Sequence, residues 1–337
     1  MSRKQHINEK LEMRQKWREP WASVARCAVT VVAQLAILAG CGGELSDKKP
    51  CSAVEILVGF GIGGGTDLFS RNLSVGLSET LGVPVQVVNI TGGSGVGAFR
   101  NLFKRPVDGC TLLALTSDYV VLDVLQPNDV DLDRLAPLAR AHTELGLLST
   151  RSAGAKSWDV LVAQTKAQGR RLLIGGVGAR SFDWTAVDIT LSNTGVPYRY
   201  IPYGGTKEMH ADLFGGRLDA IYDEFGVMQP IFATGEARPL MTLSEKPYGI
   251  LKDTPSAASL GLGVAPPIWR GIVMHADTPV EDITRYANAV QIAMQTEAYQ
   301  SYEANRHLNL TQGALDADRF KAALSLDRIN FKSALTD

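Results

Sequence analysis

The chain has 337 residues, with 34 basic and 35 acidic side chains and a formal net charge of −1. This balance, without a block of like charge, argues against nucleic acid or an anionic membrane surface as the main partner. The length exceeds what one small core needs and suits two domains of ordinary size. We therefore expect two domains and no nucleic-acid binding.

The N-terminal segment has the features of an export signal. A basic stretch leads into the apolar run CAVTVVAQLAILAG, which is shorter than the roughly 20 residues of a membrane-spanning helix. The sequence Leu-Ala-Gly-Cys that ends at Cys41 matches a lipoprotein signal, with translation starting at Met1 or Met13. We expect residues 1–40 to be removed and Cys41 to carry lipid, an ordinary signal peptide being the alternative. The mature protein is then periplasmic or on the cell surface, and touches a membrane only through its lipid anchor.

The segment VEILVGFGIGGGTD, residues 54–67, is the most informative stretch of the chain. An apolar strand breaks into five glycines within seven residues and then reaches Thr66 and Asp67, which can cap a helix. Such a loop presents backbone N–H groups to an anion at a helix N-terminus. The alternative is a tight strand-to-helix turn that needs glycine only for positive φ.

The same loop contains the G-x-G-x-x-G pattern of dinucleotide-binding enzymes, at Gly59, Gly61 and Gly64. That pattern needs an acidic residue about 20 residues further on, at the end of the next strand, to bind a ribose hydroxyl. Here the strand VPVQVVN ends at Asn89 instead. Because export would also separate the protein from a nicotinamide pool, we disfavour an NAD-dependent oxidoreductase and expect no cofactor.

Strands, glycine-rich loops and helices alternate along the mature chain. From Val54 to Leu115 this order predicts an open parallel sheet with right-handed crossovers, whose polar loops meet at the carboxyl ends of the strands. A second α/β unit of the same kind follows, and the late strand WRGIVMH with the terminal helices is expected to return to the first unit. The expected lobes are residues 41–148 with 271–337, and residues 149–270, with a cleft between them.

Two cysteines remain once the signal is removed and Cys41 is lipidated. Cys51 and Cys110 each lie just before an apolar strand, and in a sheet of order 2-1-3 these strands are parallel neighbours entered from the same end. A disulfide is therefore geometrically possible in an oxidising compartment, and would stabilise the domain by roughly 4 kcal/mol on the chain-entropy model. Two buried free thiols are the alternative.

The sequence shows no pattern typical of catalysis or metal binding. Its five histidines are scattered without ligand spacing, and no serine has the surroundings of a nucleophile elbow. Asp223 and Glu224 could form a catalytic carboxylate pair, but no histidine, cysteine or metal-spaced cluster accompanies them. We expect neither enzymatic activity nor a metal site.

Polar groups in further loops are candidates for contacts with an anionic ligand. The loop ITGGSGVG adds backbone N–H groups and Ser94. Ser181 and Asp183 follow another glycine-rich turn, in which Arg180 could add a charge-assisted hydrogen bond or simply face solvent. Tyr203 could present its hydroxyl to a ligand or pack against the protein.

Six segments, in this order, resemble the substrate-binding proteins of tripartite tricarboxylate transporters, the Bug or TctC-like family. They are VEILVGFGIGGGTDLFSRNLSVGLSETLG, VPVQVVNITGGSGVGAFRNL, PVDGCTLLALTS, LLIGGVGARSFDW, VPYRYIPYGGTKEMHADLFGGRLDAIYDE and ATGEARPLMTLSEK. The resemblance implies a two-lobed α/β fold of the type II periplasmic-binding class, each lobe a mostly parallel sheet flanked by helices. It also implies a monomer that captures a small organic carboxylate for a permease with a large and a small subunit.

The resemblance further implies which loops grip the carboxylate, largely through backbone amides and bridging waters. With the candidates above, the expected ligand-binding residues are Gly63, Gly64, Gly65, Thr66, Asp67, Ser94, Gly95, Thr116, Ser117, Arg180, Ser181, Asp183, Tyr203, Gly204 and Asp223. Gly59 and Ile62 replace the prolines usual in the family's first loop, which implies a more mobile loop. With the further departures at Cys110, Trp184 and Arg180, we expect a pocket for a different acid. A receptor that reports ligand occupancy to a membrane sensor is the alternative function, because both roles use the same cleft.

Overall fold

The structure, a computed structural model, describes residues 51–311 and 313–336. The predicted signal peptide at residues 1–40 and the predicted lipid site at Cys41 lie outside these residues. Within the described part of the chain, no helix is both long enough and apolar enough to cross a membrane.

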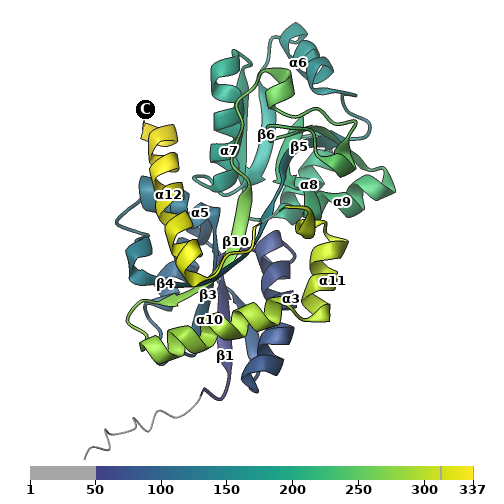
Figure 1. Ribbon diagram of the computed structural model, residues 1–337. Helices are drawn as coiled ribbons and strands as arrows, with labels where there is room; N and C mark the ends of the chain where they lie inside the picture. Colours follow the sequence, from purple (N-terminus) through teal and green to yellow (C-terminus); the bar gives the residue numbers. More distant parts are fainter. Residues whose placement is uncertain (1–50, 312, 337) are drawn as a thin grey trace, which may run out of the picture. The chain divides into compact units, whose positions relative to one another are not determined.

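The apolar runs of the sequence form two five-stranded sheets (Figure 1). The first sheet has the order β2 (Val85–Asn89), β1 (Val54–Val58), β3 (Thr111–Thr116), β10 (Ile268–His275) and β4 (Leu135–Glu144). The second has the order β7 (Tyr198–Tyr203), β6 (Leu172–Val177), β8 (Ala220–Glu224), β5 (Gly146–Arg151) and β9 (Ala237–Thr242). We call each sheet with its helices a lobe, lobe 1 and lobe 2; the predicted lobe limits, at residues 148 and 270, fall within β5 and β10.

All strands of each sheet run in one direction except a single reversed strand. In lobe 1, β1 is parallel to β2 and β3, whereas β10 is antiparallel to β3 and β4. Lobe 2 repeats this arrangement, with β6 parallel to β7 and β8, and with β5 antiparallel to β8 and β9. The reversed strand is in each case the one that arrives from the other lobe, since the chain crosses from β4 to β5 and returns from β9 to β10. The expected pair of mostly parallel sheets is confirmed.

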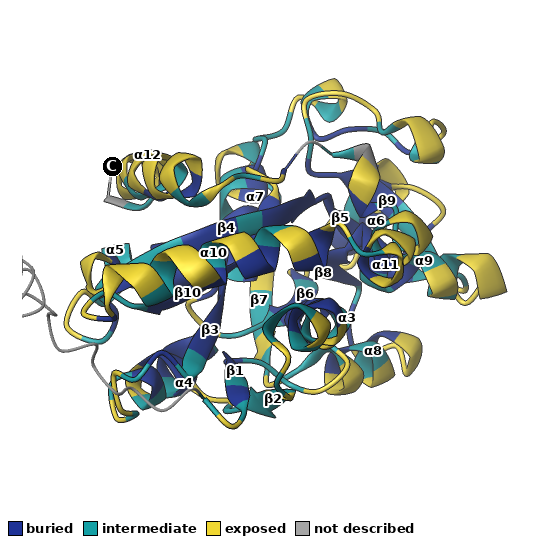
Figure 2. Ribbon diagram, turned by 60° about the horizontal axis from the view of Figure 1, so that its bottom comes forward, coloured by how far each residue is buried: buried dark blue, intermediate teal, exposed yellow. Residues whose placement is uncertain are grey.

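Helices cover both faces of each sheet, because neighbouring strand residues point to opposite faces. On β1, for example, Ile56 packs in one core and Leu57 in another. In lobe 1 the first core contains α3 (Gly65–Leu81), α10 (Val280–Met294) and α11 (Glu297–Asn305), and the second contains α4 (Val96–Leu102), α5 (Ser117–Leu125) and α12 (Ala317–Thr336). In lobe 2, α6 (Trp158–Ala167) and α7 (Phe182–Leu191) cover one face, and α8 (Thr206–Phe214) and α9 (Phe225–Thr234) the other. Figure 2 shows buried strands beneath α10, whose outer face is exposed.

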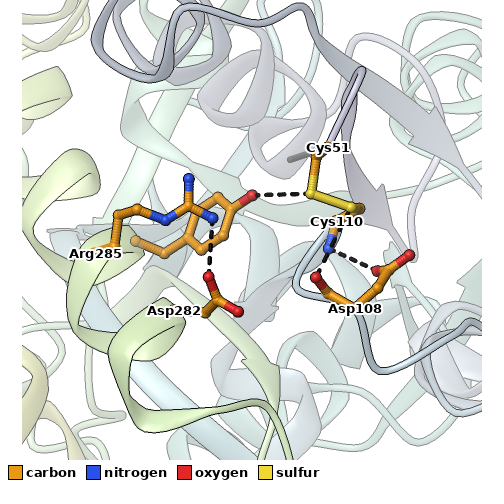
Figure 3. Close-up of a disulfide and its surroundings, with 6 residues drawn as sticks. Cys51, Asp108, Cys110, Asp282 and Arg285 are labelled. Carbon is orange, nitrogen blue, oxygen red and sulfur yellow. Dashed lines mark hydrogen bonds and ion pairs between the residues drawn. A yellow bond between two sulfur atoms is a disulfide. The ribbon is translucent and has the colours of Figure 1, made fainter. Parts of the chain in front are cut away.

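A disulfide joins Cys51, just before β1, to Cys110, just before β3 (Figure 3). The pairing of β1 with β3 places the two Cα atoms 5.6 Å apart, within the range that a disulfide spans. Tyr286 of α10 lies against the bridge, with its hydroxyl 3.7 Å from the Cys51 sulfur. The bridge closes a loop with a sequence separation of 59 residues, which contains β1, α3, β2 and α4.

Candidate ligand-binding site

A cavity of about 420 Å³ lies between the loops of the two lobes. Lobe 1 contributes residues between Phe60 and Thr66, in the loop after β1 and the start of α3. Lobe 2 contributes Gly204 to Glu208, in the loop after β7 and the start of α8. The remaining lining residues are Asp118, Val177, Asp183, Asp223, Glu224, Ile268 and Arg270. The volume falls in the range of about 300–1,000 Å³ found for small-molecule pockets.

Two of the helices that begin at this cavity, α3 and α8, have a glycine as N-cap. The N-cap residues of α3 and α8 are Gly64 and Gly205, which provide no side-chain acceptor. By contrast, Thr116, Ser157 and Ser181 cap α5, α6 and α7 with their hydroxyl oxygens. The first N–H groups of a helix have no intrahelical acceptor and lie at the positive end of its dipole. The starts of α3 and α8 can therefore bind an anion in the cavity.

Asp67 holds the first loop in place and does not line the cavity. Its carboxylate accepts hydrogen bonds from the Gly63 N–H and from Asn89, both at 2.9 Å, and pairs with Arg71. Burial raises the pKa of Asp67, but hydrogen bonds from Arg71, Gly63 and Asn89 outweigh it and lower the pKa below the usual value. Asn89, where a dinucleotide enzyme would carry its acid, thus ties the loop to β2.

The second glycine-rich loop packs against the first loop and against lobe 2. A Cβ on Gly59 would lie 2.7 Å from the Cα of Gly95, so the loops approach closely because both residues are glycine. The Tyr119 hydroxyl donates to the Gly95 carbonyl at 3.2 Å. Ser94 lies against Gly178 of lobe 2, where a Cβ would overlap the serine hydroxyl. This loop therefore packs against the first loop and against lobe 2, and none of its residues lines the cavity.

A buried arginine joins the two lobes beneath the first loop. Arg270 on β10 is 2% exposed and pairs with Glu144, at the end of β4, and with Glu224, at the end of β8, the second at 2.8 Å. Its Nε donates to the Thr66 hydroxyl at 3.2 Å. Because Glu144 belongs to lobe 1 and Glu224 to lobe 2, the guanidinium links the lobes where the chain crosses between them.

The two carboxyl groups that Arg270 contacts differ in their pKa values and therefore in their charge at neutral pH. Burial raises the pKa of Glu144, but the charge of Arg270 and a hydrogen bond with His142 outweigh it and lower the pKa to about 2. Burial raises the pKa of Glu224, and the positive charge of Arg270 lowers it. Because the negative charges of Asp223 and Glu144 raise it further, the pKa reaches about 8. At neutral pH Glu144 is therefore ionised and balances Arg270, whereas Glu224 is mostly protonated.

We expect Glu224→Gln to stabilise the protein above about pH 8. Folding raises the pKa of Glu224 from 4.5 to about 8. The protonated group therefore contributes its full stabilisation below pH 4.5, and this contribution is lost as the pH rises through the folded-state pKa of about 8. Glutamine keeps an acceptor for Arg270 without ionising. Above this range the free energy of unfolding should exceed that of wild type by more than about 1.4 kcal/mol, the value of one pKa unit. Urea unfolding across the pH range measures the difference.

Glu144→Gln is the matched control, because its pKa is shifted in the opposite direction. A carboxylate with a lowered pKa stabilises the folded protein at pH values above its ordinary pKa, and this stabilisation is lost as the pH falls through the lowered pKa. Glu144→Gln should therefore be less stable than wild type at neutral pH. Parallel pH profiles for wild type and Glu224→Gln would contradict the assigned charge states.

Only part of the predicted ligand set lines the cavity. The predicted residues that do so are Gly64, Gly65, Thr66, Asp183, Gly204 and Asp223. Those that do not are Gly63, Asp67, Ser94, Gly95, Thr116, Ser117, Arg180, Ser181 and Tyr203. The lining residues that the prediction omitted include Asp118, Lys207, Glu208, Glu224 and Arg270.

Contacts within the protein explain several positions outside the cavity. Thr116 and Ser181 are helix caps, and the Ser117 hydroxyl accepts a hydrogen bond from the β10 backbone at 3.1 Å. The Tyr203 hydroxyl donates to an aspartate of α8 at 2.7 Å, and Arg180 is exposed. Among the described residues, no group of three histidine, cysteine or acidic side chains is arranged to hold a metal ion.

Comparison with known proteins identifies the family. A family model described as the tripartite tricarboxylate transporter family receptor matches residues 69–324. The chain belongs to this family. Among curated relatives, the protein BugT of Bordetella pertussis is 28% identical over 261 residues, which cover 75% of this chain and 79% of BugT. A Cupriavidus necator protein, described as a UPF0065 protein in the gbd 5' region, is 26% identical over 282 residues, covering 82% of this chain and 85% of the relative.

Solved structures with the same fold are similar over nearly their whole length. The receptor matches MatC from Rhodopseudomonas palustris, solved with bound malate, at 20% identity and a TM-score of 0.76, covering 85% of this chain and 99% of MatC. It matches Rpa4515 from the same organism, solved with adipate, at 23% identity and a TM-score of 0.76, covering 86% and 97% of the two chains. The expected family and two-lobed α/β fold are thus confirmed.

Proposed function

We propose that this receptor captures a small organic carboxylate outside the cytoplasm and delivers it to a two-subunit membrane permease. The observation that carries the proposal is the cavity between the uncapped N-termini of α3 and α8. Malate and adipate, bound to proteins of the same fold, are both small carboxylates, which supports this ligand class. A binding role requires no turnover, and we expect none.

In this proposal the carboxylate lies between the two helix starts. Backbone N–H groups at Gly65 and Thr66 of lobe 1 and at Thr206 and Lys207 of lobe 2 would donate to its oxygens. Ligand contacts from both lobes favour a closed arrangement of the lobes, with the crossovers β4–β5 and β9–β10 as hinges. Arg270 lies next to these crossovers and keeps Thr66 in place through its hydrogen bond.

A thermal-shift screen against mono-, di- and tricarboxylates and aromatic acids tests the proposal. A ligand that binds only the folded protein raises its unfolding temperature by mass action. Gly64→Val is the control variant, since a Cβ at Gly64 has only the Gly61 carbonyl oxygen nearby, at 3.4 Å, and the side chain would occupy the cavity. We expect this variant to fold and to lose the ligand-induced shift. An equal shift in the variant would contradict the role of this loop.

Export and lipidation at Cys41 belong to the same proposal. We expect Cys41→Ala to release the receptor from membranes into the soluble periplasmic fraction, because the thiol that would carry lipid is absent. Cell fractionation and intact mass of the mature protein measure this. Wild type that is already in the soluble fraction, without an acyl mass shift, would contradict the anchor.

A further inference from the structure

We propose that the ligand carries an ammonium or guanidinium group besides its carboxylate, and that Asp183, Asp223 and Glu224 bind this cation. The inference rests on the proposed carboxylate-binding function and narrows its ligand class to zwitterionic acids. It concerns the acidic wall of the cavity, which Asp183, Asp223 and Glu224 form, and not the helix N-termini of α3 and α8.

The buried part of this wall has more acidic than basic groups. The buried ionisable residues lining the cavity are Asp118, Asp183, Asp223, Glu224 and Arg270. Glu144, which does not line the cavity, balances the positive charge of Arg270, and His210 contacts Asp223 at 2.6 Å. Lys207 and Glu208 are exposed at the cavity edge and offset each other. The second carboxylate of a dicarboxylate would therefore meet no buried cation that is not already paired, whereas a cationic group would meet an excess of acidic groups.

Asp183 has an oxygen without a partner at the cavity. Its side chain comes from the first turn of α7, lines the cavity and is 8% exposed. The Oδ2 atom accepts the Val177 N–H at 2.7 Å, but among the described residues no group donates a hydrogen bond to Oδ1. Oδ1 is not among the buried side-chain atoms without a partner, so it is accessible from the cavity, and a donor for it has to come from water or from the ligand. An ammonium group in the cavity would provide one.

Glu224 and Asp223 extend this acidic surface from β8. The Oδ1 atom of Asp223 accepts the backbone N–H of Glu224 at 2.9 Å, and its Oδ2 lies 2.6 Å from Nε2 of His210. Burial and the negative charges of Asp223 and Glu144 raise the pKa of Glu224 to about 8. Burial, with the charges of Glu224 and Asp118, also raises the pKa of Asp183 well above its usual value. Without a ligand, the raised pKa values favour protons on Asp183 and Glu224. A bound cation would take the place of these protons.

Two sets of acids matched in length test the inference by isothermal titration calorimetry. The shorter set is 4-aminobutanoate, succinate and butanoate, and the longer is 6-aminohexanoate, adipate and hexanoate. Within each set one end is a carboxylate, and the other end is cationic, anionic or uncharged. In at least one set we expect the amino acid to bind at least about tenfold more tightly than the other two, because only its ammonium group can form ion pairs with the acidic groups once they release their protons.

Asp183→Asn should remove this preference. The amide oxygen can still accept the Val177 N–H, so the loop keeps its bond while the wall loses an acidic group. Asp188→Asn is the control on the same helix, since Asp188 contacts Tyr198 and does not line the cavity. We expect the control to retain the preference. If Asp183→Asn fails to fold, Glu224→Gln makes the same test from β8.

The outcomes separate this inference from the proposed function. Tighter binding of a diacid or of an uncharged-tail acid in both sets would overturn the cation site and leave carboxylate binding intact. Unchanged preference in folded Asp183→Asn and Glu224→Gln would overturn the assignment to these residues. If none of the six acids binds, the zwitterion inference fails, and the proposed function fails with it only if the wider carboxylate screen is also negative.

Discussion

Gly65→Ala should lower the free energy of unfolding by about 3–5 kcal/mol, the usual cost of breaking a buried ion pair from one side. A Cβ at this position would overlap the guanidinium of Arg270. That group cannot move cheaply, because it is buried and is held by Glu144, Glu224 and Thr66. Displacing it would leave charged groups unpaired in the interior. Denaturant unfolding of the purified variant measures the loss.

Gly64→Ala is the matched control on the neighbouring residue. Its Cβ would meet only the Gly61 carbonyl oxygen, at an ordinary contact distance of 3.4 Å. Its φ of −72° also suits any residue. We expect its stability to stay within about 1 kcal/mol of wild type. Equal stabilities for Gly65→Ala and Gly64→Ala would show that Arg270 is not confined as described.

Removing the disulfide should cost about 4 kcal/mol of stability on the chain-entropy model, because the bridge closes a long loop of the unfolded chain. The sequence separation between Cys51 and Cys110 is 59 residues. The double variant Cys51→Ser/Cys110→Ser should therefore unfold at a clearly lower denaturant concentration than wild type. Tyr286 packs against the bridge, so α10 should lose protection from amide exchange as well.

Wild type treated with a reductant separates the cross-link from the serine substitutions. Reduction should produce most of the loss seen in the double variant, because the loop opens in both. Coincident unfolding curves for oxidised and reduced wild type would contradict a stabilising bridge between β1 and β3.

The order of elements could be read from the sequence where glycine-rich loops separate clean apolar runs. Local patterns mark these elements: Leu73 and Leu77, about one helical turn apart, are fully buried in α3, and Ser157 caps α6. By contrast, the sequence pattern does not predict the strands β4 and β5. β4 places His142 and Glu144 in the interior and contains Pro137, so its residues show no simple alternation. The proline is accommodated because β4 is an edge strand.

The charged part of the site depends on residues far apart in the sequence. The loop Gly64 to Thr66 was predicted, because glycines before a helix indicate an anion site by themselves. Arg270 was not, because its partners Glu144 and Glu224 are 126 and 46 residues away and meet it only through the strand crossovers. The signal that could have indicated it is an arginine inside the otherwise apolar strand WRGIVMH. A buried arginine needs acidic partners, and that need points to the ends of β4 and β8.

The most direct test of the account compares an acid with its methyl ester. The tightest ligand from the carboxylate screen and the corresponding ester would be titrated into the receptor by calorimetry, under the same conditions. Because the N–H groups at the starts of α3 and α8 are proposed to bind an ionised carboxylate, we predict that the acid binds and that the ester is at least about tenfold weaker. An ester that binds as tightly as the acid would mean that these loops are structural turns, and would contradict carboxylate capture at this cavity.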